Sequence, residues 1–117
     1  MVNIENVQGV WHILNRAKRP MTYGDVAKKL GYTDKRAGRI LWRYLWIIGD
    51  YCVRRRQPPL NAIVVRQDIG EPGEGVLLRE GRTVRGEIRA VLRGPSRLST
   101  PTPEVIRKTW ERLRKTL

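Results

Sequence analysis

Apolar side chains recur with the period of an α-helix through the first part of the chain. The spacing predicts a helix over residues 3–18, with Asn3 as its N-cap and Pro20 beyond its end. A short extended segment then leads into a second helix over residues 24–30, which Gly31 ends as a C′ glycine. The chain is therefore expected to begin with two short amphipathic helices.

A third and longer helix is predicted to begin at Thr33 or Asp34 and to end at about Ile48, before Gly49. Four basic side chains lie largely off its apolar stripe: Lys35, Arg36, Arg39 and Arg43. A helix of about seven residues, a short turn and a longer basic helix make the pattern of a helix-turn-helix. A plain three-helix bundle gives similar short helices, and the basic face of the third helix favours DNA as the ligand.

The segment that follows changes from helical to extended character. Residues 60–66 are predicted to form a strand, because the apolar run from Ala62 to Val65 is too short for a helix. A glycine-rich loop follows over residues 68–75, and residues 76–79 are predicted to return as a second strand. The two strands and their loop predict a β-hairpin, which after a helix-turn-helix would be its wing.

Two further helices are predicted near the end of the chain. Thr83 is a candidate N-cap for a helix over residues 84–92. Thr102, followed by a proline and a glutamate, is a strong start for a last helix that reaches about Lys115.

These elements together predict an α+β fold, a winged helix-turn-helix of three helices and a β-hairpin wing with additional C-terminal helices. Its main domain is expected to span residues 1–93, including the helix after the wing. Residues 94–101, rich in Ser, Pro and Gly, are expected to be a linker. The last helix, within residues 102–117, is expected to pack on the same domain.

Net charge narrows the choice of partner. The 117 residues include 24 Lys and Arg against 11 Asp and Glu, for a formal net charge of +13. This excess is beyond what solubility requires and indicates a polyanion, with DNA expected and RNA not excluded. Four arginines are expected to contact phosphates: Arg54, Arg55, Arg56 and Arg66. The alternative is that the chain is simply a soluble cation.

Three short motifs follow one another within residues 22–65. They are Thr22-Tyr23-Gly24-Asp25-Val26-Ala27 with Leu30-Gly31, Arg36-Ala37-Gly38-Arg39-Ile40-Leu41, and Pro59-Leu60-Asn61-Ala62-Ile63-Val64. Their order resembles the DNA-binding half of the alkylguanine-DNA alkyltransferases and their alkyltransferase-like relatives. The family's motifs are T-Y-G-x-[VI]-A, R-A-V-G-x-A-[LM] and P-C-H-R-V-[VI], with tryptophan in place of cysteine in the alkyltransferase-like branch.

The resemblance implies a winged helix that holds DNA through the minor groove and flips a base. Tyr23 would take the role of rotating a phosphate, and Arg36 that of filling the gap in the base stack. The plainer alternatives are that Tyr23 packs at the start of its helix and that Arg36 binds phosphate. Leu60 stands at the acceptor cysteine position and Asn61 at the adjacent histidine position, which excludes the family's alkyl transfer. Asn61 is therefore grouped with the expected nucleic-acid contacts, without catalysis.

The acids of the glycine-rich loop allow a second interpretation. Asp68, Glu71 and Glu74 could hold Mg²⁺ or Mn²⁺ for phosphodiester hydrolysis, as in a small metal-dependent nuclease of a toxin or mobile element. Their spacing matches no EF-hand and no Walker loop. Acids in such turns usually face solvent and cap backbone amides. We therefore expect no catalysis, no metal and no cofactor, and keep the nuclease as the alternative.

Trp42 and Trp46 lie four residues apart, on a face offset from the apolar stripe of the third helix. Core packing is the plain role for them, and base stacking is another. If Trp42 is exposed, the pair would indicate a homodimer or a protein partner. The chain would then be a basic nucleoprotein assembly factor.

A single cysteine, Cys52, and a single histidine, His12, leave no disulfide framework and no multi-cysteine zinc site. Cys52 is expected to be a small buried hydrophobe. No apolar run approaches the roughly 20 residues that span a bilayer, and no signal peptide is apparent. The expected location is cytoplasmic, on the nucleoid if the source is bacterial or archaeal, with no membrane partner.

Overall fold

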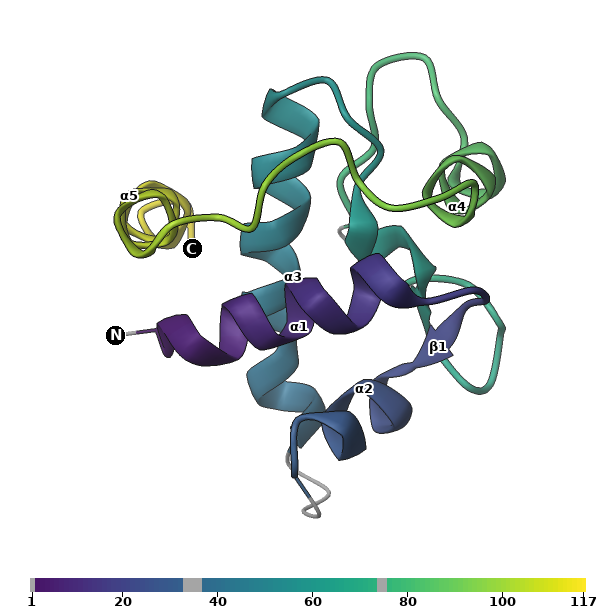
Figure 1. The fold of residues 1–117 in the computed structure, drawn as a ribbon, viewed down its shortest axis with the longest axis horizontal. Coiled ribbons are helices and arrows are strands. Elements are labelled where there is room, and N and C mark those ends of the chain that lie inside the picture. Colours follow the sequence, from purple (N-terminus) through teal and green to yellow (C-terminus); the bar gives the residue numbers. More distant parts are fainter. Residues whose placement is uncertain (1, 33–36, 74–75) are drawn as a thin grey trace.

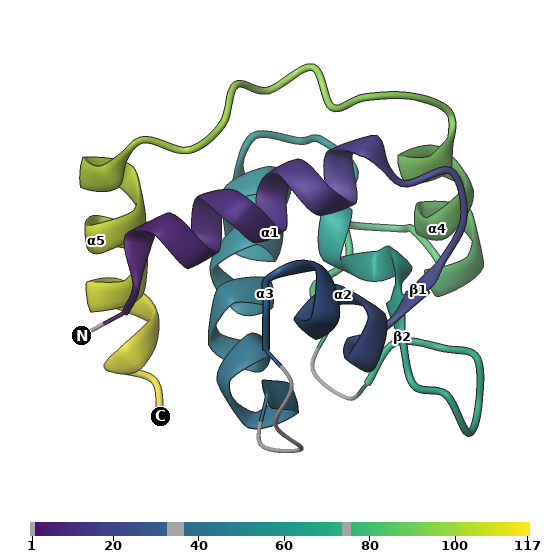
Figure 2. The same ribbon diagram turned by 60° about the horizontal axis from the view of Figure 1, so that its bottom comes forward.

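The computed structural model describes residues 2–32, 37–73 and 76–117. These residues contain five α-helices, one 3-10 turn and one pair of short strands. The first helix, α1 (Ile4–Arg16), crosses the middle of the long helix α3 (Ala37–Arg54), as Figure 1 shows. The helices α4 and α5 lie on opposite sides of this central pair (Figures 1 and 2). The result is a compact α+β fold around one hydrophobic core.

Side-chain caps start the first two helices where the sequence predicts. The side chain of Asn3 accepts a hydrogen bond from the backbone N–H of Asn6, 3.0 Å away, which confirms it as the N-cap of α1. The helix α2 (Tyr23–Lys29) starts at a capping box, in which Thr22 and Asp25 each bind the other's backbone N–H. Gly31 lies just beyond its end, with a φ of +93° that glycine adopts without strain.

The helix α3 is longer than predicted, because Gly49 does not end it. The start expected at Thr33 or Asp34 lies outside the described residues. Buried side chains continue on both sides of the glycine, with Ile48 and Cys52 fully buried. Their packing outweighs the cost of about 1 kcal/mol that a glycine brings to a helix interior. Gly49 is also required for space, since a Cβ there would lie 2.7 Å from the Oδ1 of Asn61.

The structure corrects the prediction of a β-hairpin wing over residues 60–66 and 76–79. Leu60–Ile63 form a 3-10 turn, η1, and only Val64–Val65 form a strand, β2. Its partner is β1 (Met21–Thr22), which runs parallel to it, with Met21 opposite Val64. Residues 76–79 lie outside any strand.

Burial explains why the hairpin prediction is wrong. Residues 60–65 are all buried, whereas a wing strand would expose every second side chain. Directly after Val65 the chain turns, because the N–H of Arg66 donates to the carbonyl of Glu71 and the N–H of Gly70 donates to the carbonyl of Arg66, both at 2.8 Å. The φ of +66° at Gly70 allows this turn. The extended segment therefore joins the core and does not leave it as a wing.

The last two helices begin at the predicted threonines. The side chain of Thr83 caps α4 (Val84–Leu92), and the side chain of Thr102 caps α5 (Pro103–Arg114). Both helices contribute to the common core, through Val91 in α4 and through Ile106 and Leu113 in α5.

The segment between these two helices runs across the molecule from α4 to α5 (Figure 2). Hydrogen bonds hold it to α1 and α3. The backbone N–H of Ser96 donates to Asn15 in α1, and the hydroxyl of Tyr51 in α3 donates to the carbonyl of Ser99. The side chain of Gln8 donates to the carbonyl of Pro101. This expected linker is thus tied to α1 and α3 by hydrogen bonds.

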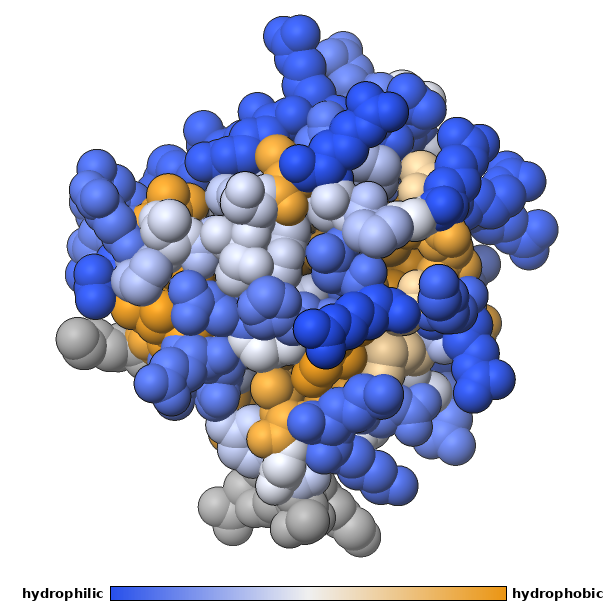
Figure 3. Space-filling view, in the orientation of Figure 1, coloured by the Kyte–Doolittle hydropathy of each residue, from blue (hydrophilic) through white to orange (hydrophobic). Residues whose placement is uncertain are grey.

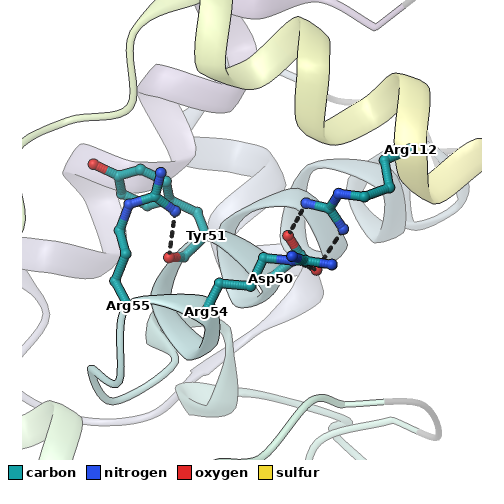
Figure 4. Close-up of polar contacts among 5 residues, drawn as sticks. All are labelled: Asp50, Tyr51, Arg54, Arg55 and Arg112. Atoms are coloured by element: carbon teal, nitrogen blue, oxygen red, sulfur yellow. Dashed lines mark hydrogen bonds and ion pairs between the residues drawn. The ribbon is translucent and has the colours of Figure 1, made fainter.

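An ion pair also fixes α5 to the end of α3. The carboxylate of Asp50 accepts two hydrogen bonds from Arg112, at 3.2 and 2.7 Å, and one from Arg54 at 3.3 Å (Figure 4). Asp50 is buried, and Arg112 is partly exposed. Within the described ranges, no helix has both the length and the apolar character needed to cross a membrane.

Candidate functional site

An aromatic pocket lies where the start of α2, the first half of α3 and the glycine-rich loop meet. Its volume is about 330 Å³. Six residues form most of its wall: Tyr23, Trp42, Trp46, Asn61, Gly73 and Val76. We call this cavity the aromatic pocket.

Asn61 is the polar side chain that the fold buries at this pocket. It belongs to η1, and only 7 % of its surface is exposed. Its Oδ1 atom is buried and has no hydrogen-bond partner among the described residues. An unpaired buried acceptor costs about 1–3 kcal/mol of stability. Asn61 is therefore a polar residue with an unpaired, buried oxygen at a largely apolar pocket wall.

Tyr23 also lines the pocket and is half-buried. It is the first residue of α2, so the capping box at Thr22 fixes its backbone. The glycine-rich loop approaches it closely, since a Cβ on Gly73 would lie 3.1 Å from the hydroxyl of Tyr23. A larger residue at position 73 would push the loop or the tyrosine away. Tyr23 and Asn61 thus line the same pocket.

The two tryptophans of α3 meet a third from α5. The ring centroids of Trp42 and Trp46 are 5.8 Å apart, and each lies 6.3 Å from the ring of Trp110. The guanidinium of Arg43 lies 5.5 Å from the Trp42 ring centroid and 5.7 Å from that of Trp110. Trp42 keeps 38 % of its surface exposed, and Trp46 is half-buried. Helix α5 thus covers part of the Trp42 and Trp46 surface that was expected to contact a partner.

The structure describes two of the four basic residues that were expected to face the DNA groove. Arg39 and Arg43 are both exposed, on the half of α3 that carries the pocket tryptophans. Lys35 and Arg36 lie outside the residues whose side chains are described. The base-replacing role expected of Arg36 therefore stays a prediction.

The expected phosphate contacts do not form one cluster. Arg54 pairs with Asp50, and Arg55 lies with its guanidinium 4.1 Å from the ring centroid of Tyr51 (Figure 4). Arg66 forms two hydrogen bonds to Asp68, at 3.1 and 2.6 Å. Arg56 instead borders a second concavity beside α4.

The acidic loop gives no support to a metal site. The guanidinium of Arg66 binds Asp68 and lowers the pKa of its carboxyl. Glu71 is exposed, and Glu74 lies outside the described residues. Among the residues that the structure describes, no three His, Cys, Asp or Glu side chains gather as metal ligands would.

Cys52 is buried inside α3, as expected. Burial raises the pKa of its thiol from 9.0 to about 11, because the charged thiolate would lose its hydration. The thiol is therefore protonated at neutral pH and is a poor nucleophile.

Sequence reasoning missed the second concavity, which is lined by arginines that follow the glycine-rich loop. It has a volume of about 780 Å³ and lies between the end of α3, η1 and α4. A signal for it is present in the dense arginine content of residues 79–97. Without the fold, those arginines add only to the overall charge.

The chain matches no protein-family model, no curated protein and no solved structure. Its function therefore has to be argued from the two concavities, the buried oxygen of Asn61 and the distribution of charge.

Proposed function

We propose that this protein binds DNA without catalysis and accepts an everted base in the aromatic pocket. The observation that carries the proposal is the unpartnered Oδ1 of Asn61, buried at the wall of a cavity that Tyr23, Trp42 and Trp46 also line. Aromatic walls offer stacking to a planar ring, and the Asn61 amide would hydrogen-bond the edge of a base.

The size and polarity of the pocket suit this ligand. At about 330 Å³ it falls at the lower end of the range of about 300–1,000 Å³ for small-ligand sites. Such sites are mostly apolar with a few polar groups that fix the orientation of the ligand. Asn61 supplies a group of this kind.

The charge around the pocket supports a nucleic acid as the source of the ring. Arg39 and Arg43 are exposed on the same helix as the pocket tryptophans, and the chain carries a net charge of +13. Contacts to phosphates would hold the duplex and offset the few kcal/mol that base eversion costs. The buried thiol of Cys52 is protonated and therefore a poor nucleophile, which supports binding over group transfer.

The proposal also assigns a role to the helices beside the pocket. In it, α2 and α3 act as a helix-turn-helix pair, in the manner of the alkyltransferase-like proteins that the motifs resemble. The glycine-rich loop borders the pocket at Gly73.

The proposal is tested with two synthetic duplexes that differ in one central base pair, matched or mismatched. A mismatched base costs less to evert, so we expect at least about tenfold tighter binding to the mismatched duplex by fluorescence anisotropy. The variant Asn61→Leu should bind both duplexes equally and keep the affinity for the matched one.

Arg39→Gln is the contrasting variant, because it removes a charge that is exposed on α3. It should weaken binding to both duplexes by the same factor and keep the preference. Equal affinity of the unaltered protein for the two duplexes would contradict the pocket proposal.

A further inference from the structure

The second concavity is strongly basic. It lies between the C-terminal end of α3 and α4, with η1 at its floor. Six arginines line it: Arg56, Arg79, Arg82, Arg89, Arg93 and Arg97. In Figure 3, hydrophilic side chains gather along the top and the right of the molecule, where Figure 1 places the end of α3 and α4. We call this concavity the arginine groove.

Among the described residues, little negative charge compensates the charge of this groove. No acidic residue is among the described residues that line it. Five of its six arginines form no ion pair with another described residue. The six positive charges repel one another, so an anion with several charges would relieve the repulsion.

The sixth arginine is held in place by a buried carboxylate. Glu87 is fully buried in α4 and accepts hydrogen bonds from the Nε and Nη2 atoms of Arg79 and from its backbone N–H. The shortest of these contacts is 2.8 Å. A buried charge is costly unless it is fully paired, so this pair fixes Arg79 rigidly at the wall of the groove.

Arg56 stands where a helix normally ends in glycine. Its φ is +59°, and it is the one non-glycine residue with positive φ in the described part of the chain. The N–H groups of Arg56 and Gln57 donate to the carbonyls of Val53 and Cys52, both at 3.0 Å, which closes α3. A left-handed conformation is unfavourable for a residue with a side chain. Retaining an arginine there indicates a use for its charge in the groove.

We propose that the arginine groove binds the phosphodiester backbone of a nucleic acid, as a contact separate from the aromatic pocket. The planar guanidinium matches phosphate oxygens in pairs, and arginine is the only basic residue type among the described residues that line the groove. The two sites lie on different sides of η1, because Leu60 lines the groove and its neighbour Asn61 lines the aromatic pocket. The protein thus holds backbone on one side of η1 and a base on the other.

The test measures how the affinity for a matched duplex depends on salt. In the groove variant, Arg82, Arg89 and Arg93 are changed to Gln. The slope of log affinity against log salt should become shallower by about 0.9 for each phosphate that the variant no longer neutralises, or about 2–3 in total. The matched control is Arg107→Gln, Lys108→Gln and Lys115→Gln, which removes three exposed charges on and beside α5. The control slope should stay close to that of the unaltered protein.

A second variant, Arg56→Gly, tests the same proposal if the triple variant folds poorly. Glycine adopts the left-handed conformation freely, so the melting temperature should not fall. The salt slope should still become shallower by about 0.9. Equal slopes for the groove variants and the control would overturn the proposal.

The two proposals fail separately. The groove variants should keep the preference for the mismatched duplex, because they leave Tyr23 and Asn61 unchanged. If the groove variants leave the salt slope unchanged and the mismatched duplex is still preferred, only the groove proposal is contradicted. If the unaltered protein does not prefer the mismatched duplex, only the pocket proposal is contradicted. If the triple variant keeps its duplex affinity but no longer binds polyglutamate, the groove binds an acidic protein and the proposal is wrong.

Discussion

Asn61 shows at the scale of one residue how a local cost indicates a site. A buried oxygen without a partner lowers stability, and Gly49 gives up a helix-favouring side chain to make room for it. Their combination is understandable if the Asn61 amide serves a ligand.

Asn61→Leu should therefore raise the free energy of unfolding by about 1 kcal/mol, because the apolar side chain leaves no orphan acceptor. Denaturation with urea measures the change. The control is Asn15→Leu, which removes an acceptor that binds the N–H of Ser96 at 2.6 Å. That variant should be less stable by about 1–3 kcal/mol. A lower stability of Asn61→Leu would mean that the Asn61 amide supports the fold.

Cys52 gives a prediction for alkaline pH. The pKa of the buried thiol is about 11, against 9.0 for an exposed one, so the unfolded chain releases this proton first as pH rises. The contribution is fully present below pH 9.0, and the free energy of unfolding should fall between there and about pH 11. The fall due to this group is at most about 3 kcal/mol.

The variant Cys52→Ala isolates this effect from the titration of lysines and tyrosines. Its stability should decline less over the same pH range than that of the unaltered protein, as chemical denaturation at several pH values would show. Parallel curves for the two proteins would mean that the thiol is hydrated in the folded state.

At the scale of elements, α5 depends on one strong polar contact in addition to its apolar face. Arg112 binds the buried carboxylate of Asp50, which raises the pKa of the guanidinium. On the same helix, Arg114 pairs with Glu111 in full exposure to solvent. The two ion pairs have the same chemistry and differ in burial.

Arg112→Gln should lower the free energy of unfolding by about 1 kcal/mol or more, because Asp50 is deprived of a bidentate partner at a buried position. Arg114→Gln, with the same change of charge, should alter it by less than about 0.5 kcal/mol, as is usual for exposed pairs. Urea denaturation of both variants checks the difference. Equal effects would show that the Asp50 ion pair is as well solvated as the surface pair.

The elements that could be predicted are those with local signals. Thr83 and Thr102 offer side-chain oxygens to the first turn of a helix, and Gly31 offers a left-handed C′ position. The hairpin could not be predicted correctly, because Val64 and Val65 are apolar in either arrangement. Their true partner, β1, is distant in sequence, and tertiary packing alone selects it.

The candidate site was predictable only in part, for the same reason. The motifs around Tyr23 and Asn61 pointed to two residues that the structure brings to one pocket. The orphaned oxygen of Asn61 depends on packing against Gly49, which no spacing reveals. The arginine groove needs the fold as well, since Arg56 and α4 meet only in three dimensions.

At the scale of the whole molecule, the net charge of +13 should control affinity for nucleic acid. Binding to any duplex should weaken steeply between about 50 and 200 mM salt, because counterions released from DNA drive association. Anisotropy titrations across this range measure the slope. An affinity that hardly changes with salt would contradict nucleic-acid binding through phosphates.

The parallel pairing of β1 with β2 also bears on how the molecule reaches its native state. Tyr23 directly follows β1, and Asn61 lies in the turn just before β2, so the two sides of the aromatic pocket are joined by this ladder. Parallel pairing of distant segments is slow, since the loop between them must close first. Helices α2 and α3 should therefore form early in refolding, and ligand-binding competence should appear only in the last kinetic phase.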